Sequence, residues 1–385
     1  MNPADDAYLD HNAATPLDPR VREQLVADLT REWANPNSLH RHGRAARAVL
    51  EDAREDLAAT LAVPARGIVF TSGGTEANNL ALGSLAHHAP SGGGLWISAV
   101  EHPSVTEAAQ AAARARPDLE LVVLPVDGAG CLVLPTVAGP HPVAASLVLA
   151  QSETGTLQPV PELGHLMHQT GGWLHSDAAQ ALGRIPLAPA CSVCDLLTLS
   201  PHKAGGPTGV GVLVVREPDL LHPMLVGGGQ ERGLRAGTEP VPLARAAALA
   251  IRLAINEGAE RALRMAAARD AFEARLLSQP GIEALGRRAT TRLPNTASML
   301  FRGVDGRALL LALDARGISA SIGSACASRS PLPSPALLAM GLSENEARAT
   351  VRFSFDQHAA IGRAEEMAEQ AGAAFSALRK ASLAR

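Results

Sequence analysis

The sequence predicts an α/β fold in two parts: a large domain with a central, mainly parallel seven-stranded sheet covered by helices, and a smaller α+β domain. From about residue 43 to 255, helical stretches alternate with short β-rich runs that end in small or polar residues. Most of these runs are continuously apolar, as expected for parallel strands that helices cover on both faces. After about residue 240 the composition becomes that of one long helix rich in Ala, Arg, Leu and Glu, which extends through roughly residue 278, and a second unit is expected to begin within this stretch.

The predicted elements of the large domain follow one another regularly. Residues 43–62 form an amphipathic helix, because Ala46, Leu50 and Leu57 share one face and charged residues lie opposite. Another helix covers residues 76–86. The expected strands are residues 68–71, 95–99, 119–126, 146–150, 173–176, 196–199 and 210–215.

The second unit is expected to begin near residue 256. A long helix extends to about residue 278, followed by a strand at 296–301 and a helix at 306–316. The predicted division is a large domain at residues 15–255 and a small domain made of residues 1–14 and 256–385.

The composition is that of an ordinary globular protein and argues against several function classes. The 385 residues are 46% hydrophobic and 19% charged, with a formal net charge of −4. That charge, a pI near 6.4 and only six Phe, three Trp and one Tyr argue against nucleic-acid binding. No apolar run approaches the roughly 18 residues of a membrane span, and the N-terminus lacks signal-peptide features. We therefore expect a cytoplasmic protein without membrane association.

Lysine is almost absent from the sequence. Of the 34 basic residues, 32 are Arg, and the two lysines are Lys203 and Lys380. A compositional bias toward Ala, Arg and Gly explains the shortage, but it also singles out an internal lysine that remains. A guanidinium cannot replace an amine that must lose its proton and form an imine. Lys203 lies between apolar runs and is the candidate for such chemistry, whereas Lys380 lies in a polar tail.

Polar side chains gather after five of the predicted strands. They lie in residues 71–76, 101–103, 151–155, 177–180 and 200–203. Ligands of parallel sheets bind beyond the carboxyl ends of the strands, so we expect these residues to meet at one edge.

Residues 72–75 predict an anion-binding turn, because the segment follows a strand and opens a helix, whose free N–H groups and dipole point at one spot. The alternative is a plain turn with Thr75 as the N-cap. Lys203 beside such a site is the arrangement expected for a Schiff base with a phosphate-bearing aldehyde cofactor. The alternative for Lys203 is a solvated loop lysine.

Three further side chains suit a ring-shaped cofactor. Asp177, directly after a strand, is placed to keep a pyridine nitrogen protonated, and Gln180 is placed to hydrogen-bond a ring hydroxyl. His102 is placed to stack on a flat ring or to shuttle protons, although a lone His is more often structural.

The four cysteines are too few for a disulfide framework. Cys191 and Cys194 form a CxxC motif, but no second pair or nearby His completes a zinc site, so we interpret them as buried apolar residues and expect no metal ligands. Cys131 is a turn or strand-start residue. Cys326 differs, because small, polar and Pro residues surround it, which indicates a nucleophilic thiol on an exposed loop.

Together these residues resemble the NifS/IscS type of cysteine desulfurase, within the class V aminotransferases of the fold-type I pyridoxal 5'-phosphate (PLP) enzymes. The resemblance extends over nearly the whole chain. It includes the motifs at residues 8–16 (YLDHNAATP), 35–40 (NPNSLH), 71–79 (TSGGTEANN), 101–103 (EHP), 202–203 (HK), 227–239 (GGGQERGLRAGTE), 323–326 (GSAC) and 351–354 (VRFS).

The resemblance implies how PLP is bound in the large domain. Lys203 carries PLP as a Schiff base, Asp177 faces the pyridine nitrogen, and Gln180 contacts the ring hydroxyl. His102 stacks on the ring. The residues implied for the phosphate are Gly74, Thr75, Ser200, His202 and, from the second subunit of a homodimer, Thr238.

The resemblance also implies the reaction, which converts L-cysteine to L-alanine. Asn12 and Arg352 hold the substrate carboxylate, which the planar guanidinium matches with two hydrogen bonds. The freed Lys203 amine takes the α-proton, and the Cys326 thiolate, carried by the small domain, attacks the substrate sulfur and becomes a persulfide. Cys326, Lys203 and His102 are thus the implied catalytic residues.

The sequence departs from the family pattern at Ser152, where the family usually has an Asn that touches the cofactor. Serine is shorter, so we expect this contact to be lost or mediated by water. The spacing from Cys326 to Gly341 matches the subgroup that delivers sulfur to protein acceptors, which implies a partner such as an iron–sulfur scaffold, of the nitrogenase type or another. The alternatives are another class V enzyme, such as a selenocysteine lyase or an aminotransferase, and a scaffold without cofactor.

Overall fold

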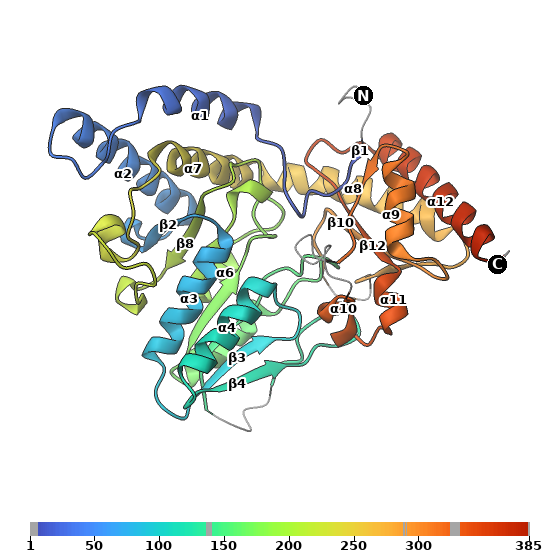
Figure 1. Cartoon of the computed structure of the whole chain (residues 1–385), viewed down its shortest axis with the longest axis horizontal. Coiled ribbons are helices and arrows are strands. Elements are labelled where there is room, and N and C mark those ends of the chain that lie inside the picture. Colours follow the sequence, from blue (N-terminus) through green and yellow to red (C-terminus); the bar gives the residue numbers. More distant parts are fainter. Residues whose placement is uncertain (1–6, 136–140, 288, 290, 324–331, 384–385) are drawn as a thin grey trace.

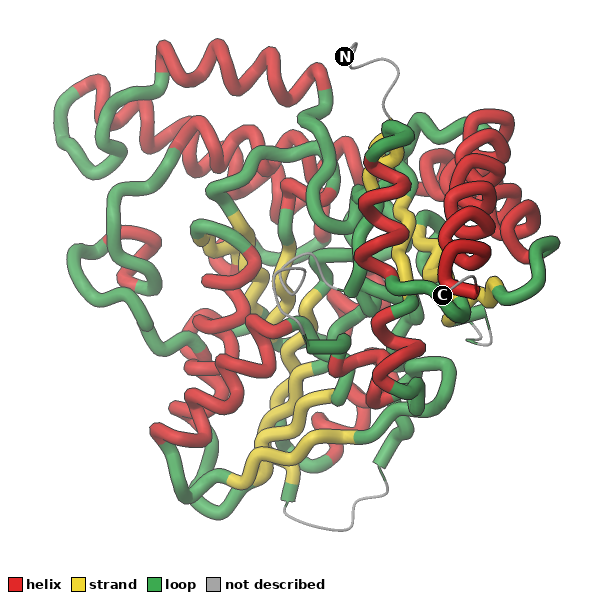
Figure 2. Tube along the Cα trace, turned by 45° about the vertical axis from the view of Figure 1, so that its right-hand side comes forward, coloured by secondary structure: helices red, strands yellow, loops and turns green. Residues whose placement is uncertain are grey.

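The chain forms two sheet-centred units that lie side by side (Figure 1). The computed structural model describes residues 7–135, 141–287, 289, 291–323 and 332–383. The larger unit contains the central sheet, and the smaller one contains helices α8 (Gly258–Leu277), α9 (Gly306–Asp314) and α12 (Ile361–Leu383) with a short antiparallel sheet (Figure 2). The mixed α/β class predicted from the sequence is confirmed.

The central sheet has seven strands in the described part of the chain, in the order β2-β8-β7-β6-β5-β3-β4. All neighbours are parallel except that β8 runs antiparallel to β2 and β7. Strands that helices cover on both faces are mostly apolar, and β2, β3, β7 and β8 are buried throughout. The strands are β2 (Ile68–Thr71), β3 (Gly94–Ser98), β4 (Glu120–Leu124), β5 (Pro142–Ser146), β6 (Trp173–Asp177), β7 (Leu196–Leu199) and β8 (Gly211–Val215).

Helices cover both faces of this sheet. Alternate residues of a strand point to opposite faces, so Ile68 and Phe70 pack in one core cluster and Val69 packs in another. The first cluster includes residues from α2 (Arg41–Leu61), α5 (Val160–Gln169), α6 (Ala188–Val193) and α7 (Val241–Asn256). The second includes residues from α3 (Gly74–His88) and α4 (Pro103–Ala115). The helix α1 (Pro19–Arg31) packs on α7.

Two predicted boundaries are wrong. Strand β5 is residues 142–146 and not 146–150. Its small residues pair with both β3 and β6. Leu147 and Leu149 lie beyond the pairing with β3 and donate to the carbonyls of His175 and Asp177 in β6, and Ala150 forms a bridge with Leu157. The expected long helix is two helices, α7 and α8 (Gly258–Leu277). They separate at Glu257, whose carboxylate binds Arg20 and Arg261 and which precedes Gly258, a poor helix former.

The smaller unit has its own core. The strand β10 (Thr296–Phe301) lies between β9 (Ile282–Leu285) and β12 (Thr350–Ser354) and is antiparallel to both. The core includes Ala7 and Leu9 from the N-terminal segment, where β1 (Ala7–Tyr8) pairs with β11 (Ile318–Ser319). The exact division at residues 15 and 255 stays a prediction. The other helices are α9 (Gly306–Asp314), α10 (Pro335–Ala339), α11 (Glu344–Arg348) and α12 (Ile361–Leu383).

No helix among these described elements combines the length and apolarity that crossing a membrane requires.

Candidate active site

A cavity lies at the carboxyl ends of the central strands, where the sequence predicts that polar residues meet. The strands β3, β6 and β7 lead to His102, Asp177 and Ser200, and β2 leads into the N-terminus of α3. Eleven residues that the sequence predicts for the site line this cavity: Asn12, Gly74, Thr75, His102, Ser152, Asp177, Gln180, Ser200, His202, Lys203 and Arg352. The cavity is also lined by Ala13, Asn78, Ser104 and Ala179, to which the sequence analysis gave no role.

The N-terminus of α3 provides unpaired donors beside Lys203. No side chain caps this helix, and its first residue is Gly74. A Cβ at Gly74 would lie 2.3 Å from Oγ of Ser200, so only glycine lets the helix end approach β7 this closely. The arrangement can hold an anion against the helix dipole.

Asp177 is the last residue of β6 and is fixed by two donors. Its Oδ2 accepts a hydrogen bond of 2.8 Å from Nδ2 of Asn78, and its Oδ1 accepts one of 2.9 Å from the N–H of Ala179. Nδ2 of Asn78 also donates to Oγ of Ser104 at 2.8 Å. Asn78 is a site residue that the sequence analysis missed, although it lies four residues after Gly74 and hence on the same face of α3.

His102 caps the N-terminus of α4, and this contact fixes its tautomer. The N–H of Ser104 donates to Nδ1 of His102 at 3.1 Å, so a neutral ring carries its proton on Nε2. Burial, with the charge of Lys203, holds the pKa of His102 below its ordinary value despite the nearby Asp177. Burial and Lys203 also lower the pKa of His202, to about 4. Both rings are therefore neutral at neutral pH.

Arg352 reaches the cavity from β12 in the smaller unit. Its Nη2 forms an ion pair of 2.6 Å with Oδ1 of Asp10, and its Nη1 donates to the carbonyl of Ser152 at 3.1 Å. Nε is buried and has no hydrogen-bond partner in the described part of the chain. A buried guanidinium with an unused donor is suited to hold a carboxylate.

Asn12 belongs to the same hydrogen-bond network as Arg352 and connects its two sides. Its Nδ2 donates to the carbonyl of Ser152 at 3.0 Å and to Oγ1 of Thr296 at 2.9 Å. Its Oδ1 accepts from Nδ2 of Asn295 at 2.9 Å. The side chain thus ties the N-terminal segment to both units at the edge of the cavity.

Gln180 and Arg184 form a hydrogen-bond network beneath the cavity that connects it to the N-terminal segment. Nε2 of Gln180 donates to the carbonyl of Asn12 at 2.9 Å, and Oε1 of Gln180 accepts from Nη1 of Arg184. Nη2 of Arg184 donates to the carbonyls of His11 and Lys203. Burial, with the charge of Arg352, lowers the pKa of Arg184 to about 9. The sequence contained no signal for Arg184, because two of its partners are the backbone carbonyls of His11 and Lys203, which only the fold brings near it.

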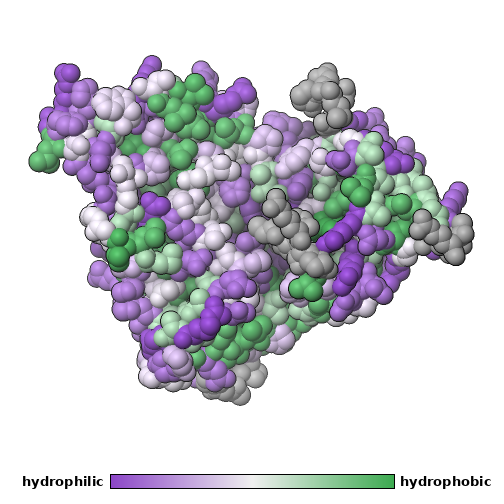
Figure 3. Space-filling view, viewed as in Figure 1, coloured by the Kyte–Doolittle hydropathy of each residue, from purple (hydrophilic) through white to green (hydrophobic). Residues whose placement is uncertain are grey.

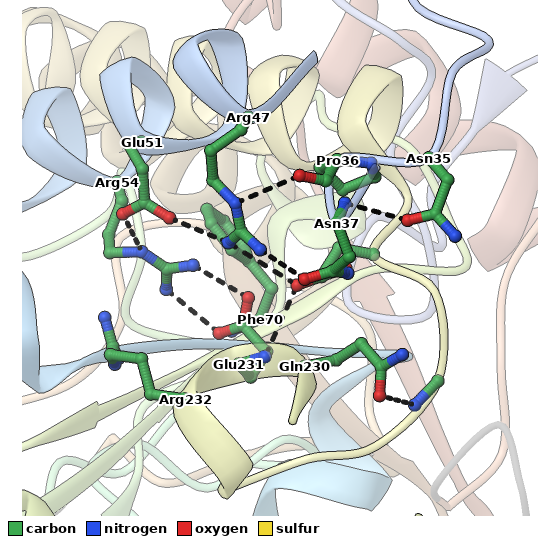
Figure 4. Close-up of polar contacts among 12 residues, drawn as sticks. Asn35, Pro36, Asn37, Arg47, Glu51, Arg54, Phe70, Gln230, Glu231 and Arg232 are labelled. Carbon is green, nitrogen blue, oxygen red and sulfur yellow. Dashed lines mark hydrogen bonds and ion pairs between the residues drawn. The ribbon is translucent and has the colours of Figure 1, made fainter. Parts of the chain in front are cut away.

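Thr238 does not line the cavity. It is exposed and precedes Glu239, whose carboxylate accepts from Nδ2 of Asn37 at 2.8 Å. Earlier in the same segment, Glu231 forms a buried ion pair with Arg54 at 2.8 Å (Figure 4). These contacts fix the segment that presents Thr238 to the surface.

Cys326, the predicted nucleophile, lies outside the described residues. Cys194 packs in the main core and Cys191 packs against it; burial raises the pKa of both thiols and of the half-buried Cys131. In the ranges that the structure describes, no group of three or more His, Cys, Asp or Glu side chains is arranged to hold a metal ion.

Comparisons with known proteins identify the family. Residues 7–363 match the family model described as Aminotransferase class-V. A cysteine desulfurase of Trichormus azollae is 37% identical over 375 residues, which cover 94% of this chain and 91% of the relative. A cysteine desulfurase of Cereibacter sphaeroides is 38% identical and is covered to 94%, as is this chain. A solved structure called a NifS-like protein superposes with a TM-score of 0.89 at 29% identity, covering 97% of this chain and 100% of that one.

Proposed function

The chain belongs to the class V aminotransferase family and, within it, to the cysteine desulfurases, and we propose that the cavity at the strand ends removes sulfur from L-cysteine. The observation that carries this proposal is the meeting of Lys203, Asp177, the uncapped end of α3 and Arg352 in one cavity. The alternative of another class V activity is not favoured, because the relatives compared above are named cysteine desulfurases.

The cofactor of this family is PLP, and the residues present fit it. No side chain caps α3, which leaves its first N–H groups open to a phosphate, and Asp177 and Lys203 line the same cavity. We assign the phosphate to Gly74, Thr75, Ser200 and His202, and the ring to Asp177, Gln180, Ser152 and His102. When bound through Lys203, PLP draws electrons from the substrate and thereby weakens its bonds at Cα and Cβ.

The residues of the chain supply binding and proton transfer. The Lys203 amine removes the proton from Cα of the substrate. Asp177, oriented by Asn78 and Ala179, holds the proton of the pyridine nitrogen. Nε of Arg352 is available for the substrate carboxylate. Asn12 orients Arg352 through the Ser152 carbonyl that both side chains contact.

Cys326 completes the reaction in this proposal. Its thiolate attacks the sulfur of the substrate, so a sulfur–sulfur bond forms while the Cβ–S bond breaks. The electron pair of that bond stays with the carbon skeleton, which gains a proton at Cβ, regains the proton at Cα from Lys203, and leaves as L-alanine. The persulfide on Cys326 then passes its outer sulfur to a protein acceptor, such as an iron–sulfur scaffold.

We also propose that the protein is a homodimer in which Thr238 of one subunit contributes to the cavity of the other. Thr238 is exposed, and the contacts of Glu231 and Glu239 hold its segment in place. Thr238 is therefore available to the cavity of a second copy. Apolar side chains also gather on the surface over α1, where Val26 and Leu29 are 61% and 59% exposed (Figure 3). Such a surface is typical of subunit contacts.

One experiment tests the proposed function. The purified protein is expected to show the absorbance of PLP linked to a lysine and to convert L-cysteine to equal amounts of L-alanine and sulfide in the presence of a reducing thiol. Lys203→Ala is expected to abolish both, and Cys326→Ser is expected to keep the absorbance and lose sulfide release. A protein that cannot be loaded with PLP would contradict the proposal, as would a Cys326→Ser variant that releases sulfide at the normal rate.

A further inference from the structure

A tight turn connects the cavity with another part of the molecule. In this turn, Oε1 of Gln151 accepts hydrogen bonds of 2.7 Å from the N–H groups of both Glu153 and Thr154. The N–H of Gly155 donates to the carbonyl of Gln151 at 3.0 Å. Ser152 lines the cavity, whereas the side chain of Glu153 contacts Ser334. The rigid turn therefore fixes the position of the Glu153 carboxyl relative to the cavity.

Glu153 lies where the two ends of the segment that carries Cys326 come together. Oγ of Ser334, after that segment, donates to Oε1 of Glu153 at 2.9 Å. A Cβ on Gly323, before the segment, would lie 3.6 Å from Oε2 of Glu153 and 3.9 Å from Cβ of Ser334. Gly323, Glu153 and Ser334 are thus mutual neighbours.

The Glu153 carboxyl group is buried, and in the described ranges one of its two oxygen atoms, Oε2, lacks a hydrogen-bond partner. Burial raises the pKa of Glu153, against the opposing effects of the Ser334 hydrogen bond and the Arg352 charge. A buried carboxyl with a free oxygen is expensive to keep for packing alone.

The chain just before the Cys326 segment is hydrogen-bonded to the backbone of Arg352. Ser321 and Arg352 exchange two backbone hydrogen bonds, of 3.1 and 2.7 Å. Nη1 of Arg352 in turn donates to the carbonyl of Ser152 in the turn. The turn, Arg352 and both ends of the segment therefore form one connected unit.

We propose that Glu153 is a positioning residue for sulfur transfer, which holds both ends of the Cys326 segment against the turn that lines the cavity. The proposal rests on the proposed function, because it assigns Glu153 to the second half of that reaction. Glu153 itself touches neither substrate nor cofactor, so its loss affects the attack by Cys326 and not the binding of L-cysteine.

The test uses the PLP-loaded enzyme and three substitutions. In single turnovers with L-cysteine, Glu153→Ala is expected to slow persulfide formation on Cys326 about tenfold, the upper range for one hydrogen bond. The absorbance of bound PLP and the KM for L-cysteine are expected to stay unchanged. Ser334→Ala is expected to act in the same direction, and the double variant is expected to be no slower than Glu153→Ala. Glu153→Gln, which keeps an oxygen for Ser334, is expected to restore most of the rate.

Ser343→Ala is the matched control. Ser334 and Ser343 are the N-caps of α10 and α11, so both substitutions remove a cap, but Ser343 contacts Glu346 and not Glu153. Its persulfide rate is expected to equal that of the wild type.

Persulfide formation at the wild-type rate in Glu153→Ala would overturn the proposal, as would a matching loss of PLP absorbance. Should Glu153→Ala fail to fold, Ser334→Ala decides: a normal rate refutes the role and a reduced rate supports it. Failure of the proposed function is distinguishable, because the wild type would then form neither alanine nor persulfide.

Discussion

Nδ2 of Asn78 donates a hydrogen bond of 2.8 Å to Oδ2 of Asp177, and this bond links the N-terminal turns of α3 to the end of β6. Both residues are buried and line the cavity. The helix end assigned to the phosphate and the carboxylate assigned to the ring nitrogen are therefore held at a fixed separation, which a rigid cofactor requires.

Asn78→Ala is expected to lower kcat/KM for L-cysteine roughly 10- to 100-fold, because a hydrogen bond to a charged group contributes about 1.5–3 kcal/mol. The change is checked by steady-state alanine formation and by the absorbance of bound PLP across pH. Asn79→Ala is the control, since within the described ranges the side chain of Asn79 donates only to the carbonyl of Thr75 on its own helix. Equal rates in the two variants would contradict the role of Asn78.

Gly74→Ala is expected to weaken PLP binding at least tenfold. The new Cβ would lie 2.3 Å from Oγ of Ser200, so either α3 or Ser200 must move away from the phosphate position. Gly73→Ala is the matched control, because its backbone is extended and a Cβ there meets no atom within 4 Å. Titration of the PLP-free variants with PLP, followed by absorbance, gives both affinities. Equal affinities would show that the tight approach at Gly74 is not needed.

The sequence was sufficient for the sheet and for most of the cavity, because these depend on local patterns. The continuously apolar runs at β2 and β7 predicted both strands with correct ends, and the segments after the strands contain nine of the predicted residues of the cavity wall. Asn12 and Arg352 were implied by the family resemblance alone. Contacts between distant segments carried no such pattern. Asn78 and Arg184 act on Asp177, Gln180 and backbone carbonyls that only the folded chain brings near them.

The same limit explains the two wrong boundaries. The run at residues 147–149 is more apolar than the small residues of β5, so hydrophobicity alone favoured the wrong segment. The break between α7 and α8 depends on Glu257, whose partners Arg20 and Arg261 include one from the other end of the large unit. A local helical pattern does not reveal such a contact.

Glu101→Gln is expected to make the protein's stability less dependent on pH. Burial and the charge of Asp177 raise the pKa of Glu101 to about 8, so the folded protein keeps the proton between its unfolded pKa near 4.5 and pH 8. The unfolded chain loses that proton, so stability falls as pH rises through this window, by at most about 1.4 kcal/mol per pH unit. The loss of stability between low and high pH is expected to be smaller in Glu101→Gln. The Gln side chain keeps an acceptor for Oγ of Ser98 and the N–H of Val148.

Urea unfolding of both proteins at pH 5.5 and 8.5 checks this expectation. The advantage of Glu101→Gln over the wild type should be larger at pH 8.5. Glu260→Gln, at an exposed position, is the control and should leave the pH dependence unchanged. A constant difference between Glu101→Gln and the wild type would contradict the raised pKa.

Arg54→Ala is expected to destabilise the protein by about 3–5 kcal/mol, because it leaves the Glu231 carboxylate buried without its partner. Arg54 and Glu231 are joined by hydrogen bonds of 2.9 and 2.8 Å, and Glu231 also accepts from the N–H of Phe70 at 3.0 Å (Figure 4). The exposed pair of Arg66 and Glu217 is the control, and Arg66→Ala is expected to change stability by less than about 0.5 kcal/mol.

A double variant separates the charge from the packing in this pair. Arg54→Met with Glu231→Gln removes both charges and keeps an acceptor for the N–H of Phe70, so it is expected to be more stable than Arg54→Ala alone. Glu231 lies at the start of the segment that ends at Thr238, so Arg54→Ala is also expected to weaken PLP binding in the dimer. The free energy of unfolding and the PLP affinity are measured on the same three variants. A double variant as unstable as Arg54→Ala would show that the lost hydrogen bonds of the Arg54 guanidinium, such as that to the carbonyl of Ile68, and not the unpaired carboxylate, cause the destabilisation.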